Sequence, residues 1–324
     1  MDIALYYVGD NTSRRIVKKV ENELRAAIRS NTVITQQIYG LDETDHYKTP
    51  QSYDQISLYF VTTQGMKCNV FRTDLENVLQ NDDNFKYVYI LSPQKVDGLT
   101  RDDTVWDVIY DNTTMFKHIN VDSFRWRYSF YASIYEKLYG TPSKDVENPE
   151  PADNYWRGLY KLSTFKSLNE IVEGARLIIE SAEEGNMYAI SYVGVCYLLG
   201  VVPFDVNEET GINLIKIATK MGNPLACALY GKCRFYGTAI EQDYRKAYIL
   251  LKMGAETDDA NVFELLGQAY HEGLGCQQDM KMAWEFFKKA RARKILENIA
   301  SKRRMHGSKI ALWKEIAYNT ETCF

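Results

Sequence analysis

A short helical segment in the first half of the chain carries the two carboxylates best placed for chemistry. The apolar residues of 70–79 recur at helical spacing, and Asp74 falls at the edge of the face that they form. A carboxylate there could point into a cleft and stabilise positive charge on a sugar carbon whose glycosidic bond is breaking. Glu76 lies two residues further on and is expected to point to solvent. The alternative for Asp74 is a solvated charge near a helix N-terminus.

The turn after the first predicted strand holds a second set of candidates. Gly9 and Asp10 follow the strand, and Ser13 and Arg14 open the next helix. Because the free N–H groups of a helix N-terminus attract anions, these residues could face a pyrophosphate, and Tyr7 completes the predicted substrate-binding set. The alternative is ordinary N-capping. The chain has neither a G-x-G-x-x-G nor a P-loop motif, which disfavours a Rossmann dehydrogenase and an NTPase.

Metal and nucleic-acid sites are not predicted. The loop that holds Asp42, Glu43, Asp45 and His46 matches no metal-ligand spacing, so a solvated loop is favoured. The basic run 302–304 could touch nucleic acid or an acidic partner, but a solvated helix end is favoured there too. A net charge of −4 argues against a protein dominated by phosphate contacts.

Length and composition are those of an ordinary globular protein. Of the residues, 45% are hydrophobic and 25% are charged. A length of 324 residues is enough for two domains. No stretch reaches the ~20 apolar residues of a membrane helix, and the N-terminus lacks the basic flank of a secretory signal. None of the six cysteines forms a C-x-x-C pair. Buried free thiols in a reducing compartment explain them best, so we expect a cytoplasmic protein.

Strand and helix signals alternate in residues 1–140. Short apolar runs predict strands, and amphipathic runs predict helices between and after them. The predicted strands are 3–8, 32–39, 56–61 and 87–91, and the predicted helices are 16–28, 70–79, 106–116 and 124–139. This order predicts a flavodoxin-like α/β domain with a parallel sheet covered on both faces. Ligands of such sheets bind at the carboxyl ends of the strands.

Three stretches within residues 166–293 repeat one pattern. Each has two glycines six residues apart with mostly apolar residues between them, and the copies recur about every 36 residues. The stretches are 191–200, 228–237 and 264–273. This period predicts helix pairs stacked into an α-solenoid. Residues 141–165 are expected to form a linker and a first helix, and residues 294–324 a C-terminal capping helix.

The third stretch extends into a longer pattern. It reads Leu265-Leu-Gly-Gln-Ala-Tyr-His-Glu-Gly-Leu-Gly-Cys-Gln-Gln-Asp279 and continues Lys281-Met-Ala-Trp-Glu-Phe-Phe-Lys-Lys-Ala290. In this pattern the helical half resembles the Sel1-like repeat family, a relative of the tetratricopeptide repeats. The resemblance implies a curved solenoid that scaffolds, senses or binds a protein partner, without catalysis of its own.

Residues 1–140 share three features with a second family. Tyr6-Tyr-Val-Gly-Asp10 runs from a strand straight into a helix, a polar segment at 41–53 follows the second strand, and Val70-Phe-Arg-Thr-Asp-Leu75 opens the helix after the third strand. In these features the domain is similar to a TIR (Toll/interleukin-1 receptor) domain. In TIR domains that hydrolyse NAD, that helix begins with W-x-x-x-E, so the resemblance places Val70 at the Trp and Asp74 at the catalytic Glu. It also implies NAD as substrate, no bound cofactor, and self-association through this domain.

The two resemblances together imply an immune- or defence-type signalling effector. Its repeats would sense or dock a protein partner and control a TIR-like domain that hydrolyses or converts NAD, with Asp74 or alternatively Glu76 as the catalytic residue. The second hypothesis is a non-enzymatic adaptor in which both halves serve protein–protein interaction. A third is a nucleotide-processing enzyme of flavodoxin-like fold unrelated to TIR domains.

Overall fold

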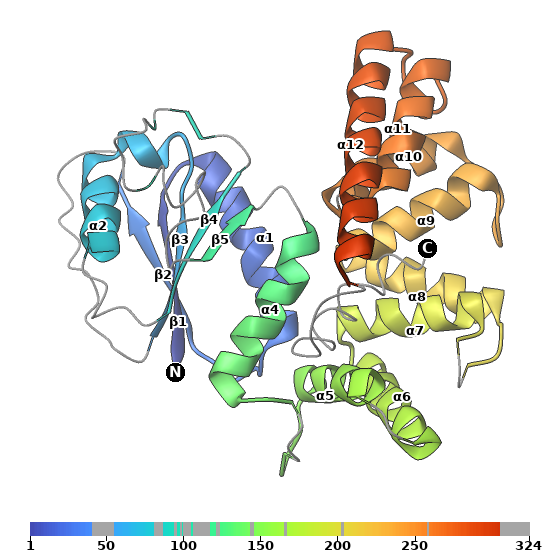
Figure 1. Ribbon diagram of the computed structural model, residues 1–324, viewed down its shortest axis with the longest axis horizontal. Helices are drawn as coiled ribbons and strands as arrows, with labels where there is room; N and C mark the ends of the chain where they lie inside the picture. The colour runs from blue at the N-terminus through green and yellow to red at the C-terminus, as the bar shows by residue number, and fades with distance from the viewer. Residues whose placement is uncertain are drawn as a thin grey trace. The chain divides into compact units, whose positions relative to one another are not determined.

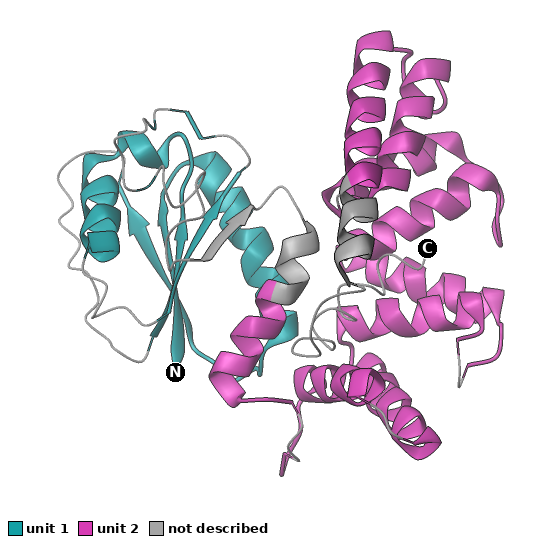
Figure 2. Cartoon of the chain, in the orientation of Figure 1, with its two compact units in different colours: residues 1–122 teal, residues 123–324 magenta. Residues whose placement is uncertain are grey.

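The computed structural model describes most of the chain as two compact units, residues 1–122 and 123–324 (Figure 2). The described residues are 1–40, 55–80, 87–93, 96–97, 99, 105, 117–120, 124–142, 146–164, 167–201, 204–257 and 259–304. For residues 117–120, 124–129 and 296–304 only the backbone is described. The acidic loop at 42–46, the helix expected at 106–116 and the tail beyond residue 304 lie outside the described residues.

A parallel sheet forms the first unit, as expected from the sequence. Within the described residues it has five strands in the order β2-β1-β3-β4-β5 (Figure 1). The strands are β1 (Asp2–Val8), β2 (Ile34–Tyr39), β3 (Gln55–Phe60), β4 (Val88–Ser92) and β5 (Lys117–Asn120). The sequence patterns did not predict β5, because Lys117-His-Ile-Asn120 is mostly polar, as a short strand at the edge of a sheet can be.

Helices cover both faces of this sheet, which is why its central strands are apolar on both sides. On one face, Tyr6 of β1 and Tyr59 of β3 pack in one core cluster with Phe71 of α2 (Asn69–Gln80). Tyr7 points to the opposite face because side chains alternate along a strand. That face carries α1 (Asn11–Ala27), which contacts β1.

Helices make up the described part of the second unit, and they pack mainly in consecutive pairs. Its helices are α4 (Phe124–Tyr139), α5 (Pro151–Thr164), α6 (Leu168–Glu183), α7 (Met187–Leu199), α8 (Glu208–Lys220), α9 (Pro224–Tyr236), α10 (Tyr244–Gly254), α11 (Ala260–Glu272) and α12 (Met280–Arg304). The pairs are α5 with α6, α7 with α8, α9 with α10, and α11 with α12. The predicted stack of helix pairs is therefore confirmed. Residues 294–304 continue α12, so this part of the expected cap belongs to the last pair.

Glycines bring the two helices of a pair together. A Cβ atom at Gly194 would lie 3.1 Å from the carbonyl oxygen of Gly211, and one at Gly158 would lie 2.5 Å from a side-chain carbon of Ile178. Gly158 therefore allows α5 and α6 to approach as closely as the helices of the later pairs do, although this pair precedes the three recurring stretches. The second glycine of each stretch ends its helix in the left-handed conformation. These are Gly200, Gly237 and Gly273, with φ of 64°, 72° and 72°.

The boundary between the units differs from the one expected after residue 140, since α4 falls in the second unit. The ring of Tyr131 lies 6.4 Å from that of Tyr188 in α7. Tyr135 donates a hydrogen bond to Asp153 of α5, which is fully buried. These contacts tie α4 to the helix pairs.

Candidate functional site

The side chain of Asp74 lies between α2 and the sheet, next to tyrosines, and only 7% of its surface is exposed. Its carboxylate accepts a hydrogen bond from the hydroxyl of Tyr39, the last residue of β2, and another at 3.4 Å from Tyr59 of β3. The ring of Tyr6 stacks on that of Tyr59, with centroids 4.4 Å apart. The alternative of a solvated helix charge is therefore wrong, because the carboxylate is held inside the core.

Burial keeps the hydroxyls of this cluster protonated. Desolvation raises the pKa of Tyr39 and of Tyr59 far above the ordinary value, and the negative charge of Asp74 raises them further. Burial also raises the pKa of Tyr6 to about 12, with a hydrogen bond to Ser57 acting in the opposite direction. The tyrosines therefore remain donors over the whole physiological pH range. The cluster places a buried carboxylate beside the carboxyl end of β2.

Glu76 lies on the outer side of α2, as expected. Its carboxylate forms an ion pair of 2.9 Å with Arg72, one turn earlier in the helix, and both side chains are partly exposed. Such a surface pair at i, i+4 spacing is common on solvated helices and contributes little to stability.

The turn after β1 is built around Asp10, which caps α1. Its carboxylate accepts hydrogen bonds from the backbone N–H groups of Thr12 and Ser13, at 2.8 and 3.0 Å. The Ser13 hydroxyl lies 3.0 Å from that of Thr62, which follows β3 and in turn accepts the N–H of Gly65. The turns after β1 and β3 thus meet between the strands where the strand order reverses. N-capping accounts for Asp10, whose own charge occupies the helix N-terminus where a pyrophosphate was considered.

Gly9 and Arg14 lie close together at the same edge of the sheet. The N–H of Gly9 donates to the carbonyl oxygen of Tyr39 at 3.0 Å. A Cβ atom at Gly9 would be 3.3 Å from a guanidinium nitrogen of Arg14, whose side chain is exposed. The backbone at Gly9 therefore leaves room for this arginine beside the carboxyl ends of β1 and β2.

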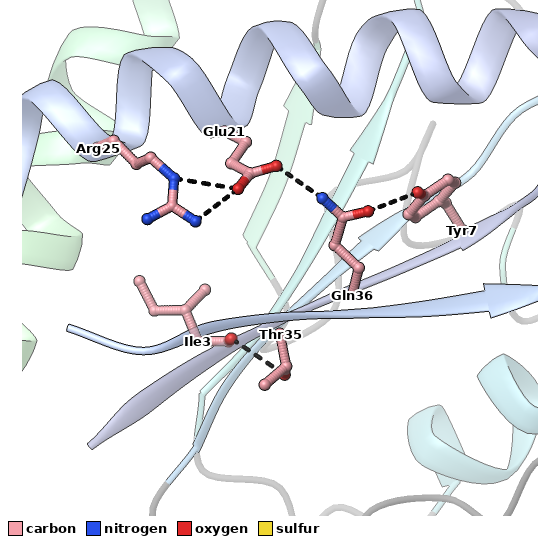
Figure 3. A network of polar contacts seen from close by, with 6 residues as sticks. All are labelled: Ile3, Tyr7, Glu21, Arg25, Thr35 and Gln36. Carbon is pink, nitrogen blue, oxygen red and sulfur yellow. Dashed lines mark hydrogen bonds and ion pairs between the residues drawn. The ribbon is translucent and has the colours of Figure 1, made fainter.

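Tyr7 belongs to a separate polar network on the α1 face (Figure 3). Its hydroxyl donates to Gln36 at 2.7 Å, and the amide of Gln36 donates to Glu21 of α1 at 2.7 Å. Glu21 also accepts from the guanidinium of Arg25. Burial raises the pKa of Tyr7.

The structure therefore does not unite the predicted site residues. Asp74 faces one side of the sheet and Tyr7 the other, because adjacent residues of a strand point in opposite directions. The residues around Asp74 were not predicted as site residues from the sequence: Tyr39 and Tyr59, which donate to it, and Tyr6, which stacks on Tyr59. The signal for them was the tyrosine content, 24 in the whole chain, combined with alternation along the strands.

The described residues form neither a metal-binding cluster nor a membrane-spanning helix. Across the described ranges, no three His, Cys, Asp or Glu side chains are grouped so that they could hold a metal ion. None of the helices in these ranges combines the length and apolar character that crossing a bilayer requires. The five cysteines that the structure describes are free thiols, and Cys323 lies outside the described residues.

Comparisons with known proteins bear on the helical half. No curated protein is found to match the chain. A Sel1 repeat protein from Oxalobacter formigenes has a solved structure with 27% identity, which covers 40% of this chain and 93% of its own, with a TM-score of 0.33. A protective antigen of uropathogenic Escherichia coli displaying an SLR fold has 17% identity and a TM-score of 0.36. That match covers 61% of this chain and about half, 53%, of the antigen.

The family model for the Sel1 repeat matches residues 188–223, 224–259 and 264–294. These three segments contain the pairs α7 with α8 and α9 with α10, and most of the pair α11 with α12. None of the matches given above is to a TIR domain. Residues 188–294 of this chain are Sel1 repeats.

Proposed function

We propose that the chain is an adaptor whose Sel1 repeats dock a protein partner. The observation that carries this proposal is the intact packing of the matched repeats. Ile215 of α8 and Leu229 of α9 lie in one core cluster, and Leu251 of α10 and Leu266 of α11 lie in the next. Stacking of this kind presents an extended and rigid surface, and a rigid surface loses little conformational entropy when it binds.

The first helices of the repeats supply the docking side in this proposal. Leu199 ends α7 and Tyr236 ends α9, each five residues after the glycine that contacts the second helix of its pair. Their side chains are 47% and 63% exposed. Large apolar side chains in equivalent, exposed positions of successive repeats are suited to contact a partner.

The test compares two double variants of the full chain. Leu199→Glu with Tyr236→Glu places charge on the proposed docking side. Ile217→Glu with Met253→Glu places the same charge on α8 and α10, at side chains that are 47% and 46% exposed. Affinity capture with quantitative mass spectrometry should recover one protein with the wild type and the control, and at least about tenfold less with the first variant. Equal recovery with both variants would reject this docking side.

We propose, as a second function, that the first unit hydrolyses NAD in the manner of a TIR domain, within an immune-type signalling protein. The strand order is that of flavodoxin-like sheets, whose ligands bind where the order reverses. In this chain the turns of Asp10 and Thr62 meet there, and Asp74 lies beside the end of β2. The repeats would then control self-association of the first unit. The free thiols support a reducing, cytoplasmic setting for either function.

Release of nicotinamide tests this second function. The full chain is incubated with NAD at high protein concentration, with and without a crowding agent. The proposal expects turnover that Asp74→Asn abolishes and Glu76→Gln leaves unchanged, with thermal unfolding curves to show that both variants fold. Turnover lost through Glu76 alone would move the catalytic role to Glu76. No turnover in any assembled state would leave the adaptor function as the conclusion.

A further inference from the structure

An unfilled pocket lies between the first and second matched repeats, where α7 meets α9 and the loop after α9. Its volume is about 200 Å³. Val195 and Leu229 line it and are buried, whereas Leu199 lines it and is exposed, so the pocket reaches from the apolar core to the surface. This volume is close to that of one large side chain, so the pocket fits one residue of a partner.

The equivalent place at the next interface, between α9 and α11, is filled by the chain itself. Residues of successive repeats are matched by counting from the paired glycines of the first helices and from the N-cap residues of the second helices. The corresponding pairs are Leu198 and Phe235, Glu208 and Tyr244, and Thr238 and Leu274. Phe235 and Tyr244 meet edge to face with ring centroids 5.3 Å apart, and Leu274 packs in the same cluster. Phe235 and Tyr244 thus place aromatic rings at the positions that correspond to Leu198 and Glu208 of the first interface.

The loops after α9 and α11 share a left-handed backbone conformation at the second residue after the glycine that ends the helix. Ala239 has φ 60°, and Gly275, at the same position of the next loop, has φ 74°. An alanine rarely adopts this left-handed conformation, yet the loop keeps it. The loop after α9 therefore shares this backbone feature with the loop after α11, whereas the loop after α7 is one residue longer than the loop after α9. The first interface lacks the aromatic side chains of the second, so an aromatic ring is the group that we expect its pocket to accommodate.

The charged residues of the pocket indicate which charge a partner should carry. The ammonium group of Lys232, which lines the pocket, is already paired with Asp259 at 2.9 Å. Glu208 also lines the pocket, and within the described ranges it has no ion pair. Glu208 is therefore an exposed carboxylate at the pocket, which a cationic group of the partner would complement.

We propose that this pocket receives a phenylalanine or tyrosine side chain of a protein partner, with a lysine or arginine next to it that pairs with Glu208. The proposal rests on the docking function of the repeats and specifies what they recognise. Aromatic residues in well-packed pockets are the usual energetic centres of an interface, so this contact should dominate the affinity of a short segment.

The experiment selects ligands from a displayed library of random short peptides on the full-length protein. The proposal expects peptides that share an aromatic residue beside Lys or Arg, and alanine in place of that aromatic residue should weaken binding about tenfold or more. The double variant Leu198→Phe with Glu208→Tyr copies the filled interface and should weaken binding by a similar factor. Ile217→Glu with Met253→Glu is the matched control and should bind as the wild type does.

Two further variants sharpen the outcome. Thr238→Leu copies Leu274 alone and narrows the pocket if the double variant does not fold. Glu208→Gln should keep the preference for an aromatic residue and lose the preference for Lys or Arg. Selected peptides without an aromatic residue would overturn the proposal. So would equal binding to the wild type and to the filled variant, although that result would leave the docking function standing.

Discussion

The carboxylate of Asp74 accepts a hydrogen bond from the hydroxyl of Tyr39, and both side chains are almost entirely buried, with 7% and 2% of their surfaces exposed. This contact joins α2 to β2. Hydrogen bonds to an ionised group are stronger than those between neutral groups. Removal of one partner also takes a hydrogen bond from the other inside the core, where the lost bond is not replaced by water as readily as at the surface.

Loss of this carboxylate should therefore destabilise the first unit. Asp74→Ala is expected to lower the free energy of unfolding by roughly 2–4 kcal/mol, and Tyr39→Phe by about 1–3 kcal/mol. Glu76→Ala, which removes only a surface ion pair, should change it by less than about 1 kcal/mol. Hydrogen exchange of the β2 and β3 amides measures the effect locally. Similar protection in Asp74→Ala and Glu76→Ala would contradict the buried role of Asp74.

Stability of the first unit should decrease in strongly alkaline solution. Burial raises the pKa of Tyr6 from 10.0 to about 12, so the folded state holds this proton more tightly than the unfolded state. The stabilisation is complete below pH 10 and is lost as the pH rises through about 12, with a size of roughly 2–3 kcal/mol. Urea titrations at several pH values across this window measure it. Tyr39 and Tyr59, whose pKa values are raised further, add to the slope in the same window. Tyr6→Phe should therefore make the dependence shallower without removing it, and an unchanged slope would count against the assignment.

Gly158 should tolerate no side chain. A Cβ atom there would lie 2.5 Å from Ile178 and 2.7 Å from the carbonyl oxygen of Gly174, so Gly158→Ala must separate α5 from α6. We expect a loss of roughly 2–4 kcal/mol of stability. Gly222→Ala is the comparison, since a Cβ atom there meets nothing within 4 Å and only the left-handed φ of 85° is strained. That variant should lose about 1 kcal/mol, measured by thermal unfolding of each protein.

The cap of α8 offers a matched pair of variants. The side chain of Asn207 accepts the N–H of Thr210 at 2.9 Å, whereas Asp205 is exposed and precedes the cap. Asn207→Ala should cost about 1 kcal/mol and Asp205→Ala less than about 0.5 kcal/mol. Chemical denaturation followed by circular dichroism distinguishes them. The reverse ranking would mean that Asp205 holds the place that Asp243 and Asp279 hold in the later repeats.

Substitutions at the left-handed loop positions Ala239 and Gly275 should change stability in opposite directions. Ala239→Gly relieves an alanine at φ 60° and should raise stability by about 0.5 kcal/mol after the entropy of the added glycine is counted. Gly275→Ala would place a Cβ atom 2.1 Å from the carbonyl oxygen of Tyr244 and should lower it by roughly 2–4 kcal/mol. Melting temperatures of the two variants are the measurement. Changes of the same sign would contradict the assigned backbone.

Sequence patterns predicted the elements in which one kind of residue recurs at a regular spacing. The parallel sheet followed from short apolar runs, and the helix pairs followed from the paired glycines. Gly158 was missed because its helix ends in Thr164 without the second glycine of the pattern. The cap at Asn207 was not predicted because the loop after α7 is one residue longer than its counterparts. Asn207 follows Gly200 by seven residues, whereas Asp243 and Asp279 follow Gly237 and Gly273 by six.

The candidate site was harder to predict because it depends on which face of the sheet each helix covers. Central strands of a parallel sheet are apolar on both faces, so the alternation of Tyr6 and Tyr7 does not say which of them meets α2. The position of Asp74 at the edge of a helical face was compatible with a cleft and with solvent. Only the tertiary packing of Tyr39 and Tyr59 against it places the carboxylate in the core.

The filled interface between α9 and α11 has a consequence for valency. Because the loops after α9 and α11 share the left-handed position at Ala239 and Gly275, replacing Phe235, Tyr244 and Leu274 by Leu, Glu and Thr should open a second pocket one repeat further along the chain. A ligand with two correctly spaced aromatic residues could then engage both pockets at once. Its gain in affinity would come from effective concentration rather than from any new kind of contact.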